Sequence, residues 1–301
     1  MIFYYVSFIY KNKISVVINQ MKIALCFWGL TRSLKYTIHS IKKHILTVLK
    51  SNNIEYKIFM HTYKFDSKYV NPRAHEYDVD LDFDEYTLLN PDYIEIDDQD
   101  EIKERINVFK YRTQDDPWNS GYISVDNFLC AMYSKKQLGL MVENCNETFD
   151  YIIYLRPDVK YHSTFDIDFL KHVNKYTICT PNFHLFPKIN DRFCILTNNN
   201  LRKYYLLFDE MYQYSLKQPL HSERFQYHIF IYHYKWSIKY IPFLFNRVRA
   251  NGNELNDINK AIQCRNKNSQ KKRNTPFRSE STKQILPMFK MNIRKPTNEL
   301  L

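Results

Sequence analysis

The sequence predicts an α/β fold with a mainly parallel central sheet flanked by helices. Apolar runs of strand length alternate with amphipathic segments of helix length between residues 22 and 241. Strand, helix, strand at this spacing is typical of right-handed βαβ units. The runs at 22–28 and 150–155 are almost continuously apolar, which is typical of strands that are covered on both faces. We therefore expect these two runs to be neighbouring interior strands.

The predicted strands are short apolar runs bounded by polar or turn-forming residues. They cover residues 22–28, 54–60, 93–96, 150–155, 176–180, 191–196 and 236–241. The polar and acidic residues 61–90, between the second and third strands, show no clear period. We expect a long functional loop or insertion there.

The predicted helices are placed by apolar repeats and by capping residues. Thr31 or Ser33 can cap the first helix, and Asp97 or Asp98 can cap the second. The expected helices cover about residues 33–50, 99–110, 121–146, 199–214 and 222–234. In the third, the candidates for inward-facing side chains are Phe128, Met132, Leu138 and Met141.

Glycine and cysteine usage excludes several classes of protein. Only four glycines occur, whereas the phosphate loops of P-loop ATPases, protein kinases and dinucleotide enzymes need several at fixed spacing. The six cysteines are scattered and form no Cys-x-x-Cys pair, so no zinc site is indicated. Their scatter within apolar runs favours a reducing compartment, and we expect a soluble, cytoplasmic protein without a transmembrane segment.

The two ends of the chain differ from the middle. Residues 1–20 contain a short apolar stretch before Met21, and we expect an N-terminal extension that is either non-native or poorly ordered. Residues 21–250 are expected to form one domain. Residues 251–301 carry 11 Lys and Arg against 4 Asp and Glu, so most of the net charge of +11 lies there. We expect this segment to be a basic, largely disordered tail.

A basic and an acidic residue follow the strand-like run at 150–155. Arg156 and Asp158 stand on either side of Pro157. Ligands bind at the carboxyl ends of buried strands in α/β proteins, because loops and helix N-termini converge there. Asp158 could hold a divalent cation or a ligand hydroxyl, and Arg156 could pair with phosphate. The alternative is a strand end with a surface Asp and an ordinary salt bridge.

Three segments in this order resemble a group of poorly characterised glycosyltransferase-like proteins with a GT-A fold. They are residues 22–32, residues 150–158 and residues 190–193. The resemblance covers about residues 21–250 and implies a sheet that binds a nucleotide sugar, with transfer of the sugar to an acceptor hydroxyl. Typical GT-A enzymes hold a metal with Asp-x-Asp at this strand end. Here the triplet is Arg156-Pro157-Asp158, so arginine replaces the first carboxylate.

The chemistry of sugar transfer suggests which residues contact the donor. The nucleoside diphosphate gains negative charge as it leaves, which a cation or basic side chains must stabilise. Asp158 could ligate Mg²⁺ or Mn²⁺, or basic side chains could act without a metal. The further donor-site candidates act through charge, close backbone approach or base stacking, and are Phe27, Gly29, Arg32, Tyr133, Lys135 and Arg156.

The acceptor side is expected from the second half of the chain. An inverting transferase needs a base that takes the acceptor proton, and the catalytic candidates are Asp191 and Glu223. Glu223 could instead only support the start of a helix. His184 and Arg192 are expected to contact the donor or the acceptor.

Three hypotheses about function remain open on the sequence. The leading one is a glycosyltransferase that uses a nucleotide sugar and a glycan, protein or lipid acceptor. The second is a catalytically inactive relative that binds nucleotide sugars. The third is a nucleic-acid-associated protein, which the position of the basic excess in the tail makes unlikely.

Overall fold

The computed structural model describes residues 21–259, and a seven-stranded sheet forms the centre of this region. The predicted N-terminal extension at 1–20 and the tail from 260 onward lie outside the described residues. The strand order is β10-β8-β9-β6-β1-β2-β5. The strands are β1 (Lys22–Trp28), β2 (Glu55–Lys64), β5 (Tyr93–Asp98), β6 (Tyr151–Leu155), β8 (Thr177–Pro181), β9 (Phe193–Thr197) and β10 (Ser237–Ile241).

The prediction of a mainly parallel α/β sheet is confirmed. Strand β1 pairs in parallel with β2 on one side and with β6 on the other, with Leu25 opposite Ile153. Only β9 runs against its neighbours in this sheet. The carboxyl ends of β1, β2, β5 and β6 therefore meet at one edge.

Strand β1 divides the core into two clusters. Ala24, Cys26 and Trp28 join one buried cluster, whereas Ile23 and its alternate neighbours join the other. Successive side chains of a strand point to opposite faces, so a run that is apolar throughout becomes an interior strand covered on both sides.

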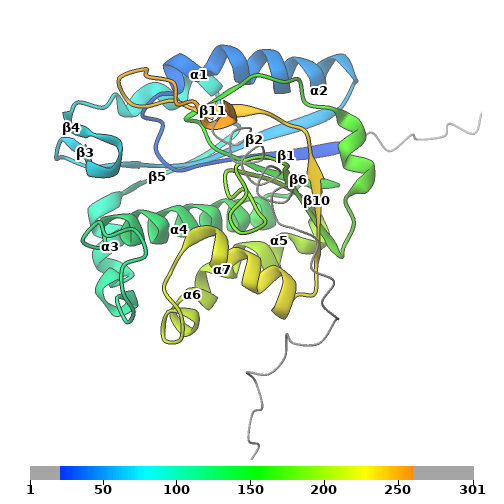
Figure 1. Ribbon diagram of the computed structural model, residues 1–301. Coiled ribbons are helices and arrows are strands. Elements are labelled where there is room, and N and C mark those ends of the chain that lie inside the picture. Colours follow the sequence, from blue (N-terminus) through cyan, green and yellow to red (C-terminus); the bar gives the residue numbers. More distant parts are fainter. Residues whose placement is uncertain (1–20, 260–301) are drawn as a thin grey trace, which may run out of the picture. The chain divides into compact units, whose positions relative to one another are not determined.

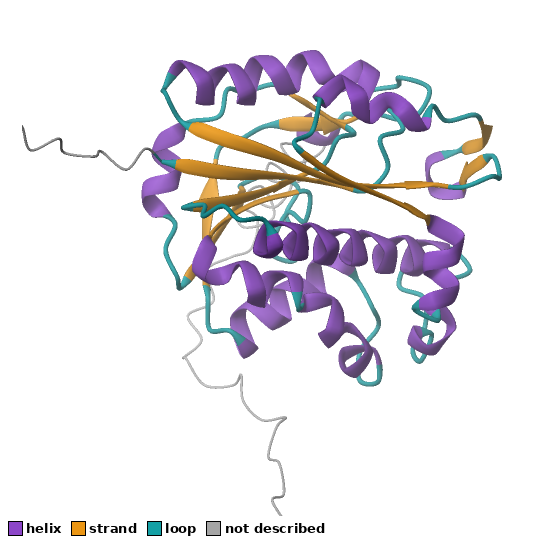
Figure 2. Ribbon diagram, turned by 180° about the vertical axis from the view of Figure 1, so that it is seen from behind, coloured by secondary structure: helices purple, strands orange, loops and turns teal. Residues whose placement is uncertain are grey.

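Helices cover both faces of the sheet (Figure 1). The helices are α1 (Leu34–Ile41), α2 (Thr47–Ser51), α3 (Gln99–Arg105), α4 (Ile123–Asn144), α5 (Asn198–Tyr205), α6 (Leu207–Ser215) and α7 (Ser222–His228). Helices α1 and α2 lie on one face, and α3 to α7 lie on the other, as Figure 2 shows from behind. No helix in the described part of the chain has the length and apolar character needed to span a membrane.

Helix α4 packs closely on α5 at Gly139. A Cβ atom added to Gly139 would overlap the Tyr205 side chain. We expect Gly139→Ala to destabilise the protein by about 1–3 kcal/mol, because overpacking outweighs the gain in helix propensity. Urea denaturation measures this change. Asn144→Ala, at the exposed end of the same helix, should shift stability by less than about 0.5 kcal/mol, and equal effects of both variants would contradict the prediction.

The expectation of a long functional loop or insertion over residues 61–90 is wrong for its first residues. Strand β2 continues to Lys64, because Tyr63 is buried and the strand pairs with β5 over these residues. A small antiparallel hairpin of β3 (Tyr69–Asn71) and β4 (Glu76–Val79) follows. Such short strands carry too few residues for a period to show in the sequence.

A second small pair lies beyond the main sheet. Strand β7 (Val159–Tyr161) pairs antiparallel with β11 (Phe245–Arg247). The chain continues from β11 to residue 259 in contact with the domain, and Asp257 is buried there. The folded region therefore extends past residue 250, where the sequence suggested that a tail begins.

Candidate functional site

A cleft with two adjoining lobes lies at the carboxyl edge of the sheet. The larger lobe has a volume of about 490 Å³ and receives Gly29, Tyr63 and Asp158 from the ends of three strands or the turns after them. The smaller lobe has a volume of about 190 Å³. The residues that line both lobes are Trp28, Ser124, Asn127, Ala131, Arg156 and Arg247. We call these residues the shared wall.

Two arginines hold Asp158 in the larger lobe. The Arg32 Nη2 donates to Asp158 Oδ2 at 2.8 Å, and the Arg156 Nε donates to Asp158 Oδ1 at 2.6 Å. Only 2% of Asp158 is exposed. Burial alone would raise the pKa of this carboxyl, but the charges of Arg156 and Arg32 outweigh it and hold the pKa well below its ordinary value. Asp158 is therefore an ionised anchor between two guanidinium groups.

This arrangement does not suit a divalent cation at Asp158. Among the described residues, Asp158 is the one carboxylate that lines the larger lobe, and both of its oxygens already accept from arginine. Mg²⁺ and Mn²⁺ prefer several oxygen ligands, and a cation here would meet two guanidinium charges at close range. The geometry favours the alternative in which basic side chains, and not a metal ion, neutralise the charge of the diphosphate.

Trp28 lies in the shared wall between two cations. The Lys135 Nζ is 4.4 Å from the centroid of the indole ring, and the Arg156 Cζ is 5.1 Å from it. These distances are typical of cation–π contacts. The indole Nε1 is buried and has no hydrogen-bond partner among the described residues. A buried donor without a partner costs free energy.

Two further arginines enter the larger lobe from the segment after β10. Arg247 donates to both carboxylate oxygens of Asp257, at 2.9 and 2.8 Å. Arg249 lies 3.8 Å from Glu76. Burial lowers the pKa of Arg249, and the nearby charges of Arg32 and Arg247 lower it further. Arg32, Arg156, Arg247 and Arg249 outnumber their acidic partners Asp158, Asp257 and Glu76, and this excess of positive charge favours a polyanion.

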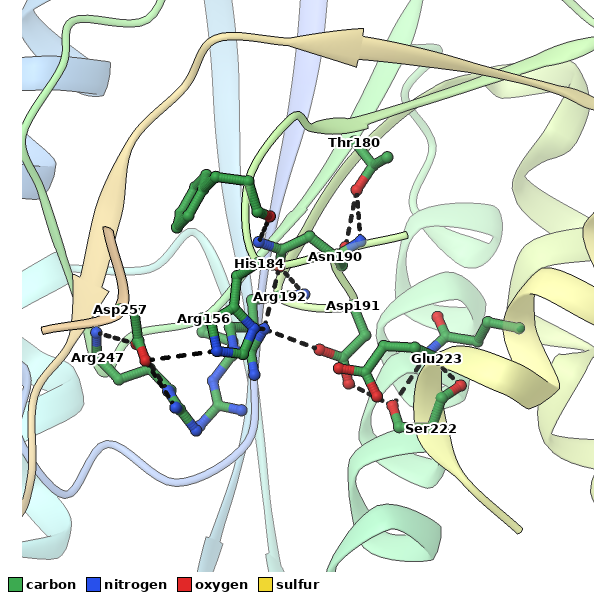
Figure 3. A network of polar contacts seen from close by, with 12 residues as sticks. Arg156, Thr180, His184, Asn190, Asp191, Arg192, Ser222, Glu223, Arg247 and Asp257 are labelled. Atoms are coloured by element: carbon green, nitrogen blue, oxygen red, sulfur yellow. Dashed lines mark hydrogen bonds and ion pairs between the residues drawn. The ribbon is translucent and has the colours of Figure 1, made fainter. Parts of the chain in front are cut away.

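A pair of carboxyl groups lies in the smaller lobe. Asp191 comes from the turn before β9, and Glu223 comes from the first turn of α7. Figure 3 shows the two carboxyl groups close together beside Ser222, whose hydroxyl donates to Asp191. Glu223 is buried, whereas 16% of the Asp191 side chain is exposed. Both carboxyl groups line the smaller lobe.

The two acids have opposite pKa shifts. Burial and the negative charge of Asp191 raise the pKa of Glu223 to about 7. For Asp191, burial would raise the pKa, but Arg192, Lys135 and the Ser222 hydroxyl together lower it. Two acids whose environments separate their pKa values in this way can take different roles in acid–base chemistry.

Basic side chains surround the acid pair. The Lys135 Nζ donates to the backbone carbonyl of Asp191 at 3.2 Å, and burial lowers the pKa of Lys135. The Arg192 Nη1 lies 3.7 Å from Asp191 Oδ1 and 3.3 Å from His184 Nδ1 (Figure 3). These contacts fix Asp191 in its ionised form.

The structure brings most of the candidate residues together. Those that line the larger lobe are Gly29, Arg32, Arg156 and Asp158. Those that line the smaller lobe are Lys135, Arg156, Asp191, Arg192 and Glu223.

Three candidate residues line neither lobe. Phe27 points to the opposite face of the sheet from Trp28 and is fully buried there. Tyr133 is buried beside His61, where its hydroxyl accepts from Arg105. His184 contacts Arg192, with its Nδ1 3.3 Å from Arg192 Nη1, but does not reach the cleft itself. The alternation of side chains along β1 explains why Trp28, and not Phe27, reaches the cleft.

Sequence reasoning missed several residues of the cleft. They are Tyr69, His75, Trp118, Asn127, Arg247 and Arg249. Asn127 lies three positions after Ser124 and four before Ala131 on α4, so helical periodicity puts these three cleft residues on one face. The arginines lie past the last predicted strand, where nothing in the local pattern distinguishes them from tail residues.

A separate group of potential metal ligands lies between β2 and β5. Single ligand atoms of His61, Glu95 and Asp97 lie within 4.8 Å of one another. The His61 Nε2 is already 3.2 Å from Asp97 Oδ2, and its Nδ1 is 3.0 Å from the Ser134 hydroxyl. These three residues line neither lobe, so this group is separate from the cleft.

No family model and no curated protein matches the chain. Solved structures that resemble it include the galactosyltransferase LgtC in complex with donor and acceptor sugar analogs, at 12% identity and a TM-score of 0.38 over 70% of each chain. Mouse xyloside xylosyltransferase 1 is 12% identical, with a TM-score of 0.39 over 74% of this chain and 84% of that one. A glycosyltransferase involved in glycosylation of the major capsid of PBCV-1 is 8% identical, with a TM-score of 0.37 over 73% and 82%.

Proposed function

We propose that the protein transfers a sugar from a nucleoside diphosphate sugar to an acceptor hydroxyl. One observation carries this proposal: a single cleft joins an arginine-rich lobe to a smaller lobe that holds two acids with opposite pKa shifts. The nucleoside lies in the larger lobe, the diphosphate lies against the shared wall, and the sugar lies beside the acid pair.

The shared wall stabilises the leaving group. Negative charge develops on the diphosphate as the bond to the sugar breaks, and preorganised donors at that position lower the barrier. Arg156 and Arg247 line both lobes and contribute positive charge there. Asp158 and Asp257 hold these arginines in place, so little reorganisation is needed during the reaction.

The two acids of the smaller lobe have different roles in the transfer step. Glu223, with a pKa near neutrality, is matched to the role of a general base that takes the acceptor proton. Asp191 stays ionised and stabilises the positive charge that develops on the sugar ring. Its charge also keeps the pKa of Glu223 raised.

Removal of the Arg156 guanidinium tests the diphosphate site. Arg156→Ala should weaken the binding of UDP, GDP or ADP by about 1.5–3 kcal/mol, as expected for a lost hydrogen bond to a charged group. The binding should be equal in EDTA and in Mn²⁺, because arginines neutralise the phosphates. Calorimetric titration of each nucleotide measures the affinity.

Arg202→Ala is the matched control, since its side chain on α5 is 75% exposed and lines neither lobe. It should bind the nucleotides as the wild type does. Equal affinities for the wild type and Arg156→Ala would remove the strand end from the site. A strong loss of affinity in EDTA would instead support a cation at Asp158.

A catalytically inactive nucleotide-sugar-binding relative is the second candidate. The observation that favours it is the Asp158 carboxylate, which two arginines occupy in place of a metal. The two candidates share the same binding and differ in turnover. Release of nucleoside diphosphate from a nucleotide sugar therefore distinguishes them.

A further inference from the structure

Trp118 lines the smaller lobe and belongs to a group of three aromatic rings in mutual contact. Trp118 stacks on His221 with ring centroids 4.9 Å apart and an interplanar angle of 28°. Phe186 lies on His221 at 4.7 Å and is 41% exposed. We call Trp118, His221 and Phe186 the aromatic wall. Trp118 is half-buried and is the member of this group that lines the lobe.

Hydrogen bonds hold the loop that carries Trp118. The Asp116 carboxylate accepts from the backbone N–H of Trp118 at 3.0 Å and from that of Tyr122 at 3.1 Å. It also accepts from the hydroxyl of Ser120 at 3.0 Å. The indole is therefore preorganised, so a ligand that contacts it need not order the loop first.

The aromatic wall continues into the acid pair. Trp118 lines the same lobe as Asp191 and Glu223. The His221 Nδ1 lies 3.3 Å from Glu223 Oε2, so one member of the wall contacts the proposed base directly. The polar side chains of Ser124 and Asn127 line the same lobe.

An acceptor held against this wall needs an apolar face, a polar edge and a hydroxyl that reaches Glu223. A pyranose ring has these features, since its C–H groups form a flat apolar face and its hydroxyls lie around the edge. Pockets that combine aromatic surfaces with a few placed polar groups bind such ligands. A hydroxyl on a flexible peptide is not part of a rigid apolar ring that could pack on Trp118.

We infer that the aromatic wall is an acceptor subsite and that the acceptor is a saccharide. This inference rests on the proposed sugar transfer and names the class of its acceptor. Trp118 contacts one face of the acceptor ring, and an acceptor hydroxyl at the end of the wall gives its proton to Glu223.

The test measures saccharide binding without any donor. Methyl glycosides of glucose, galactose, mannose and N-acetylglucosamine are presented to the wild type and followed by saturation-transfer NMR. At least one glycoside should receive saturation from the wild type. Trp118→Ala should weaken its binding by about tenfold or more, as the loss of an aromatic anchor does, and Trp118→Phe should retain most of it. Tyr176→Ala, which removes a ring that is 62% exposed outside the cleft, should bind as the wild type does.

Titration of UDP, GDP and ADP into the same variants separates this inference from the proposed function. Trp118→Ala should bind the nucleotides as the wild type does, which also shows that the variant is folded. The inference is overturned if no glycoside binds the wild type, if Trp118→Ala binds as tightly, or if a serine peptide or a lipid is the acceptor in place of saccharides. Failure of all three nucleotides to bind would refute the proposed donor site and leave the glycoside result to decide the subsite.

Discussion

Glu223→Gln should abolish sugar transfer while it leaves nucleoside diphosphate binding close to that of the wild type. The amide keeps the size of the side chain but cannot take a proton from the acceptor. Loss of a general base typically lowers the rate by about 10²–10⁴-fold. Steady-state measurement of kcat with a turned-over nucleotide sugar gives this ratio. Retention of most of the wild-type kcat would exclude Glu223 as the base.

The pH dependence of the wild-type rate tests the same role. A base acts in its deprotonated form, so the rate should rise as the pH rises through about 7, the pKa of Glu223. Asp191→Asn removes the neighbouring negative charge that raises this pKa. The rising limb should therefore move to lower pH in that variant. A limb that stays in place would show that Asp191 does not set the pKa of the base.

Folding stability provides a control for Glu223→Gln. The pKa of Glu223 is raised in the folded state, so the folded protein favours its protonated form. This contribution is fully present below the unfolded-state pKa of about 4.3 and is lost as the pH rises through about 7. Above that pH the glutamine variant should be at least as stable as the wild type, so lost activity there cannot come from unfolding.

Asp158→Asn should destabilise the protein by about 3–5 kcal/mol, because it leaves Arg32 and Arg156 without their buried partner. Transfer should be lost as well, since Arg156 no longer has the anchor that positions it. The pKa of Asp158 is depressed in the folded state, so its contribution is present above the unfolded pKa of about 3.9 and is lost as the pH falls below it. Urea denaturation near neutral pH measures the change.

Asp168→Asn is the matched control for this substitution. Asp168 pairs with Lys171 at the surface, and its side chain is 61% exposed. Its replacement should change stability by less than about 0.5 kcal/mol. If Asp158→Asn were equally mild, Arg156 and Asp158 would be an ordinary surface pair. The sequence gives no indication that the Asp158 carboxylate is buried between two arginines, because burial depends on the tertiary fold.

The main elements of the fold could be predicted because each carries a clear period. The continuous apolar run at 22–28 became interior strand β1, and the long repeat at 121–146 became α4. The β3–β4 hairpin and the β7–β11 pair could not be predicted in the same way. Their strands have three or four residues, too few for a period to show, and β7 also pairs with a partner far away in the chain.

The site residues that directly follow a strand could be predicted from the sequence. Arg156 and Asp158 were indicated by their place after an apolar run, and both line the cleft. Arg247 and Trp118 reach the cleft only through the tertiary fold, since one follows an irregular segment and the other lies in a loop. The opposite pKa shifts of Asp191 and Glu223 depend on the burial of each carboxyl group and on its distance from neighbouring charges. The spacing of residues along the chain gives neither quantity.

Turnover of a nucleotide-sugar panel tests the central claim most directly. Each donor is offered with a saccharide acceptor at about pH 8, above the pKa of the proposed base, once in EDTA and once in Mn²⁺. The release of nucleoside diphosphate and the binding of each donor, read by thermal shift, are measured together. The proposed mechanism predicts that the wild type turns over at least one donor at equal rates in both conditions and that Glu223→Gln binds this donor without turnover. A wild-type protein that neither binds nor turns over any donor in either condition would contradict the glycosyltransferase assignment.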